Sequence, residues 1–176
     1  MDPSLRNWGL AEAVLDLTSG VLDTPVLSLI EPKDPVGKQV RQNSKDLHLA
    51  EQLAAGSLTA GRRAKVIFIE CPVGSQSARA MASYGICVGV LGALRAEGIT
   101  LIEVTALEVK LALSGIKLAT KEQMIAAAVS LYPQANFPTH SGKITAKAEH
   151  VADAIGAIHA GVRTPVFQNL MRLMKP

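Results

Sequence analysis

The stretch AKVIFIE, residues 64–70, sets the architecture expected of this 176-residue chain. Its run of apolar residues is typical of a strand that is buried on both faces. The following segment, SARAMASYGICVGVLGALRAEG (residues 77–98), predicts a long apolar helix, and ITLIEVT (residues 99–105) predicts a second strand. A strand, a helix and a strand in this order favour a parallel pair joined by a crossover helix.

The segments around this unit predict a mixed α/β fold with one sheet covered on both faces. NWGLAEAVLDL (residues 7–17) and GVLDTPVLSLI (residues 20–30) predict an antiparallel hairpin, because Thr18, Ser19 and Gly20 form a turn signal between them. The other predicted segments are helices at residues 37–56 (with Gly56 as the stop), 106–113, 120–132 and 147–161, and a surface loop at residues 133–142.

Composition and charge narrow the class of protein. An apolar content of 48% and a charged content of 19% predict one globular domain, residues 1–176. The N-terminus lacks an export signal and the longest apolar run, residues 85–94, is too short to span a membrane, so we expect a cytoplasmic protein without a membrane partner. Cys71 and Cys87 lack metal-site spacing and are expected to be reduced thiols. The net charge of +3 permits a polyanionic partner without requiring one.

Acidic residues stand at three points where the predicted elements could bring them together. Asp2 precedes the hairpin, Glu70 ends the buried strand, and Asp153 shares one face of the last predicted helix with His150 and Glu149. Clustered carboxylates repel one another unless a cation lies between them, and oxygen ligands suit Mg²⁺ or Mn²⁺. Two such ions about 4 Å apart would support phosphodiester hydrolysis.

Each of these residues also has an ordinary explanation. An aspartate before Pro3 is a common turn former, so Asp2 need not be functional. Glu149, His150 and Asp153 on the last predicted helix could form an ordinary solvent-exposed polar stripe. Glu70 is less easily explained in this way, because a carboxylate at the end of a buried strand needs a partner. Periodicity alone does not show that the three positions meet.

Four motifs, taken in order, resemble those of a known family. They are Asp2-Pro3-Ser4-Leu5-Arg6-Asn7-Trp8-Gly9, Ile69-Glu70, Glu108-Val109-Lys110 with Lys121-Glu122-Gln123, and His150-Val151-Ala152-Asp153-Ala154-Ile155. Together they resemble the successive motifs of the RuvC family of Holliday junction resolvases, over nearly the whole chain. The resemblance implies a ribonuclease H-like fold, with a mixed five-stranded sheet and helices on both faces, and a homodimer.

The same resemblance implies a function and a set of site residues. The function is Mg²⁺-dependent nicking of branched DNA, chiefly four-way junctions, in recombination and repair, with Mn²⁺ as a substitute metal. The implied metal ligands and catalytic groups are Asp2, Glu70, His150 and Asp153, with Glu149 as a neighbour and not a ligand. The alanines around these residues would let the last predicted helix lie close to the sheet that carries the other two ligands.

Lysines fit this interpretation. Residues 110–147 contain five lysines and a single acid, Glu122, so this region can follow a phosphate backbone. By resemblance, Lys110 and Lys121 match family lysines near the scissile phosphate, and Lys121 is assigned a catalytic role. Lys117 completes the predicted DNA-binding set. A partner helicase is left open.

Two departures from the family pattern qualify the resemblance. Only Met1 precedes Asp2, where the family has several apolar residues of a central strand, so we expect either an upstream start or another segment that covers the gap. Val73 stands where many members have an aromatic residue that stacks on junction bases, so stacking is not expected there. Gly85, Gly89 and Gly92 are expected to pack closely on the sheet, in preference to forming a helix pair across a dimer.

Two alternative functions remain open at this point. A nuclease with the same chemistry could act more broadly on forks, flaps and other branched DNA. A protein of another class could bind junctions without cleaving them, which the short segment before Asp2 favours.

Overall fold

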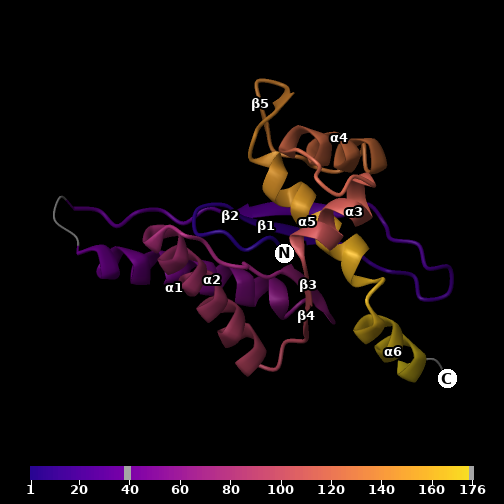
Figure 1. Ribbon diagram of the computed structural model, residues 1–176, viewed down its shortest axis with the longest axis horizontal. Coiled ribbons are helices and arrows are strands. Elements are labelled where there is room, and N and C mark those ends of the chain that lie inside the picture. The colour runs from indigo at the N-terminus through magenta and orange to yellow at the C-terminus, as the bar shows by residue number, and fades with distance from the viewer. Residues whose placement is uncertain (38–40, 175–176) are drawn as a thin grey trace.

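The computed structural model describes residues 1–37 and 41–174 and has a mixed α/β fold (Figure 1). The elements, in chain order, are β1 (Trp8–Glu12), β2 (Val26–Ile30), α1 (Gln42–Gly61), β3 (Ile67–Glu70), α2 (Ala78–Ala96), β4 (Leu101–Val104), α3 (Ala106–Ser114), α4 (Lys121–Leu131), β5 (Thr139–His140), β6 (Lys143–Ile144), α5 (Ala148–Gly161) and α6 (Pro165–Met174).

The two strand pairs predicted from the sequence are present. β1 and β2 are antiparallel, with Trp8 opposite Ile30, which confirms the hairpin, although both strands are shorter than predicted. β3 and β4 are parallel, with Glu70 opposite Val104, and α2 connects them. The crossover expected from AKVIFIE and its neighbours is therefore confirmed.

The N-terminal segment lies between these two pairs. Asp2 and Gly9 exchange both backbone hydrogen bonds, at 2.9 and 3.0 Å. On the other side, the Met1 nitrogen donates to the Phe68 carbonyl at 2.7 Å, and the Glu70 amide donates to the Met1 carbonyl at 3.3 Å. Among the described residues, the contact of Asp2 with Gly9 is an isolated bridge and not part of a longer ladder. The five-stranded sheet is accordingly not confirmed, because the described strands form three two-stranded sheets.

Helices cover both faces of the central strands, as predicted. Along β3, Ile67 and Ile69 pack into an apolar cluster with α1 and α2, whereas Phe68 points the other way, into a cluster with α5. Figure 1 shows α1 and α2 side by side, with α5 separate from them and α3 and α4 beside it.

Several details differ from the sequence-based expectations. α1 continues through Gly56 to Gly61, because Gly56 packs against the side chain of Ile30 and does not end the helix. Its predicted start at residue 37 includes residues 38–40, which lie outside the described part of the chain. The β5–β6 hairpin lies in and just after the predicted loop at 133–142, and α6 was not predicted.

The expected packing of three glycines on the sheet was wrong. Gly85, Gly89 and Gly92 are exposed, and a Cβ atom at any of them would meet no neighbour within 4 Å. The face of α2 that packs inward carries larger apolar side chains instead, namely Cys87, Val90, Leu91 and Leu94. The glycine face of α2 is therefore available to a partner.

Two further observations bear on the sequence analysis. Cys71 is half-buried and Cys87 is buried, and neither forms a disulfide. No helix within residues 1–37 and 41–174 is long and apolar enough to cross a membrane.

The close approach of β1 to α5 depends on Gly9. A Cβ atom at this position would overlap the backbone carbonyl of His150, which has no freedom to move within the helix. We expect Gly9→Ala to lower the free energy of unfolding by about 2 kcal/mol or more, as overpacking of a rigid contact does.

The control for this change is Gly92→Ala, measured at protein concentrations that keep the chain monomeric, because the added methyl group on α2 meets no atom of the same chain within 4 Å. It should stabilise the protein by about 1 kcal/mol, since alanine is the better helix former. Urea unfolding of both variants measures the effect, and equal stabilities would contradict the packing argument.

Candidate active site

The predicted ligands come from separate segments that meet at one end of the central strands. Asp2 lies in the N-terminal bridge, Glu70 at the end of β3, and His150 and Asp153 in the first turns of α5. The Nδ1 atom of His150 lies 2.7 Å from Oδ2 of Asp2, so these two are in direct contact across 148 positions of sequence. All four side chains are half-buried.

Burial and mutual repulsion perturb two of the carboxyl groups. The pKa of Glu70 is raised to about 7, mainly by burial and then by the charge of Asp2, while Lys110 acts in the opposite direction. The pKa of Asp153 is also raised to about 7, by burial first and then by Asp2, Glu70 and Glu149. The site therefore concentrates negative charge that a cation would relieve.

His150 lies between two carboxylates. Its pKa is raised, chiefly by the hydrogen bond with Asp2, and its Nε2 atom is 3.6 Å from Oε1 of Glu149. The oxygen-rich donor set with one imidazole suits Mg²⁺ or Mn²⁺. Within the described residues, no three such side chains are already arranged around one ion. Nδ1 of His150 and Oδ2 of Asp2 are hydrogen-bonded to each other. A metal ion that bound these two atoms would have to replace this hydrogen bond.

Glu149 has a partner that the sequence analysis missed. Its Oε1 atom accepts a hydrogen bond from the Nζ atom of Lys121 at 2.9 Å, and its Oε2 atom lies 2.8 Å from the same nitrogen in an ion pair. Lys121 is the first residue of α4, which packs against α5, so this contact depends on tertiary structure. The pair keeps the ammonium group near enough to Asp153 for that carboxylate to contribute to the raised pKa of Lys121, after Glu149.

The three predicted DNA-binding lysines differ in their contacts with the acids of the site. Lys110 on α3 is close enough to Glu70 to counteract the rise in its pKa. Lys121 reaches the site through Glu149. Lys117 is exposed between α3 and α4, and within the described residues it forms no ion pair. Two of the three are thus tied to the acidic cluster.

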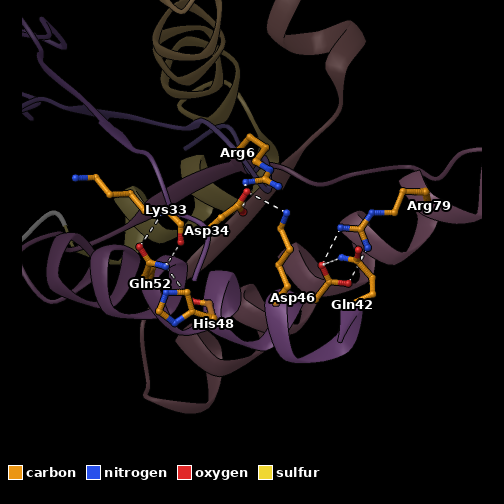
Figure 2. Close-up of polar contacts among 9 residues, drawn as sticks. Arg6, Lys33, Asp34, Gln42, Asp46, His48, Gln52 and Arg79 are labelled. Atoms are coloured by element: carbon orange, nitrogen blue, oxygen red, sulfur yellow. Dashed lines mark hydrogen bonds and ion pairs between the residues drawn. The ribbon is translucent and has the colours of Figure 1, made fainter. Parts of the chain in front are cut away.

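Arginines lie beside the N-terminal segment, where each faces an acid (Figure 2). Arg6 donates to Asp34 at 2.7 Å, and Asp34 also binds Lys45 at 3.0 Å. Arg79 donates to both oxygens of Asp46, at 2.7 and 2.8 Å. These pairs fix the segment after β2 and the start of α2 to α1. They also neutralise the two arginines that border a hollow of about 360 Å³ between residues 3–6 and the first turns of α2.

Solved structures of other proteins share the fold of this chain. No protein-family model matches the sequence, and no curated protein sequence matches it. One similar solved structure is T. thermophilus RuvC in complex with Holliday junction substrate, with 17% identity, a TM-score of 0.64, and coverage of 96% of this chain and 93% of that chain. Another is a Thermus thermophilus RuvC structure, with 18% identity, a TM-score of 0.59, and coverage of 97% and 93%. The chain therefore has a RuvC-like fold.

The raised pKa of Asp153 predicts a pH-dependent effect of Asp153→Asn on stability. The unfolded chain loses this proton near pH 3.8 and the folded protein near pH 7, so the stability contributed by the protonated group is complete below about pH 4 and is lost progressively as the pH rises to about 7. Each pKa unit is worth about 1.4 kcal/mol. Without metal, we expect the stability of Asp153→Asn relative to the wild type to rise by on the order of 3 kcal/mol between pH 5 and pH 8.

Urea unfolding in EDTA at both pH values measures this difference, because titrating groups that do not interact with Asp153 cancel in the comparison. Glu51→Gln, which removes one carboxylate at an exposed position on α1, is the matched control. Added Mg²⁺ at pH 8 should stabilise the wild type more than Asp153→Asn. The argument fails if Asp153→Asn and the wild type keep the same stability difference at both pH values.

Proposed function

We propose that this chain, as one nuclease domain over residues 1–176, is a divalent-metal-dependent endonuclease that nicks four-way DNA junctions. The observation that carries the proposal is the meeting of Asp2, Glu70, His150 and Asp153 on a RuvC-like fold. One structure with this fold is RuvC in complex with a Holliday junction substrate. A phosphodiester is the substrate class that suits clustered carboxylates and adjacent lysines.

The four site residues would hold Mg²⁺, or Mn²⁺ in its place. When bound, the metal would supply an activated water and stabilisation of the leaving oxygen. Asp2, Glu70 and Asp153 would provide oxygen ligands, and His150 a nitrogen ligand. The raised pKa values of Glu70 and Asp153 mean that these groups lose their protons near neutral pH, where a cation favours their charged forms.

The lysines would act on the DNA. Lys121, held beside the cluster by Glu149, would place a positive charge where negative charge develops on the phosphate. Lys110 would balance the charge of Glu70 and contact the backbone from α3. Lys117, which is exposed, would serve as a phosphate contact without a catalytic role.

We also propose a homodimer formed through the exposed face of α2. Met81 is 47% exposed and Val88 is 45% exposed, and the three open glycines lie on the same helix, so two helices could approach closely. A two-fold axis would present two sites to a two-fold junction. A monomer in sedimentation experiments at assay concentrations would remove this part of the proposal.

A junction-binding protein without nuclease activity is the second candidate. It is favoured by the absence, within the described residues, of three donors already arranged around one ion. Such a protein would bind junctions with or without Mg²⁺ and leave them intact. A nuclease of broader range, active on forks and flaps, shares the proposed chemistry and differs only in its substrates.

Asp153→Asn tests the metal site directly. We expect it to abolish nicking and to leave junction affinity nearly unchanged, because affinity comes from phosphate contacts and not from the acids. The measurement is the nicking of fixed junctions, mobile junctions and forks with Mg²⁺, alongside the dissociation constant. Nicking of forks as fast as junctions would support the broader nuclease. Intact junctions with the wild type would support the silent binder, and full activity of the variant would exclude the metal site.

Lys121→Ala and Lys117→Ala together test the role of the paired lysine. Lys121→Ala should lower the nicking rate at saturating enzyme by about tenfold or more, since it removes a charge placed at the reacting phosphate. Lys117→Ala should weaken binding by about eightfold at 0.1 M salt without changing that rate. Single-turnover kinetics separates the two effects, and equal saturated rates for Lys121→Ala and the wild type would remove the catalytic role.

A further inference from the structure

The β5–β6 hairpin stands out from the body of the molecule beside α4 and the start of α5 (Figure 1). Residues 139–144 are all exposed. At the tip, Ser141 and Gly142 have φ values of 49° and 74°, which is the backbone of a tight two-residue turn. At the base, the Thr145 amide donates to the Pro138 carbonyl at 3.0 Å. The segment is therefore a short, ordered β-ribbon.

The two faces of this ribbon differ in character. His140 is directly opposite Lys143, so both side chains leave the same face, and Thr139 and Ile144 form the next pair, on the other face. The sequence from residue 123 to residue 148 contains no acidic residue. Within the described part of the chain, Lys143 forms no ion pair, whereas Lys147 is paired with Glu31. One face of the ribbon thus carries cationic and hydrogen-bonding groups without a neutralising acid.

The position of the hairpin relates it to the candidate site. Its second strand leads within a few residues into α5, whose first turns carry His150 and Asp153. The contact between Lys121 and Glu149 places the start of α4 at the same end of the molecule. A DNA strand bound at the acids would therefore continue past the hairpin.

We propose that the β5–β6 hairpin contacts a duplex arm of the bound DNA, with the face of His140 and Lys143 against phosphates that border the major groove. A two-stranded ribbon fits the major groove of B-DNA. Lys143 would neutralise one phosphate, and His140 would donate a hydrogen bond to the backbone. This inference rests on the proposed function, because it takes branched DNA as the substrate.

Lys143→Ala is the test, with Lys65→Ala as its matched control. Lys65 is also an exposed lysine, but it precedes β3, at the opposite end of that strand from Glu70. The dissociation constants of a four-way junction and of a linear duplex with the sequence of one arm are measured in EDTA at several salt concentrations.

We expect Lys143→Ala to reduce the slope of log affinity against log salt by about 0.9, which corresponds to about eightfold weaker binding at 0.1 M salt. The loss should be equal for junction and duplex, Lys143→Arg should restore binding, and Lys65→Ala should match the wild type. An unchanged slope, or a loss confined to the junction, would overturn the proposal.

The outcome is separable from that of the proposed function. A wild-type protein that binds junctions but never nicks them would refute the nuclease, while a reduced slope for Lys143→Ala would still support the hairpin contact. Active wild-type enzyme combined with an unchanged slope for Lys143→Ala would refute the hairpin contact alone.

Discussion

The close packing of α5 on the central strands is the constraint on which the candidate site depends. Gly9 leaves room for the His150 carbonyl, and Gly161, at the other end of the helix, leaves room for the ring of Phe68. Between them the buried face of α5 is built largely from alanine. Larger side chains would hold the helix away from the strands. Asp2 in the N-terminal segment and His150 on α5 would then be too far apart for their hydrogen bond.

This packing also creates an electrostatic cost. Folding brings Asp2, Glu70 and Asp153 into a half-buried site, where two of them keep their protons up to about pH 7. His150 and Lys110 reduce the repulsion, but neither removes it. When these carboxyl groups are ionised, their repulsion opposes folding unless a cation is bound. Such a cost is expected where the same residues serve function at the expense of stability.

The sequence predicts the parts of the fold that depend on local pattern. The apolar run before Glu70 predicts the parallel pair, and the resemblance of the motif around His150 and Asp153 selects residues that the structure does bring near Asp2. The contact of Glu149 with Lys121 was missed, because it depends on how α4 packs against α5. The hairpin at residues 139–144 was missed because two-residue strands have no readable period. The open glycines of α2 were misassigned because small residues suit either a sheet or a helix partner.

The arginine pairs beside the N-terminal segment have a consequence for how a polyanion would first meet the protein. Arg6 and Arg79 each face a carboxylate, so the long-range field on that flank is weakened. Lys117 and Lys143, without ion pairs among the described residues, leave the α4 and hairpin flank more positive. Electrostatic steering acts before contact and depends on such unbalanced charge. Encounters at low ionic strength should therefore begin on that flank. Added salt screens this field and should lower the association rate.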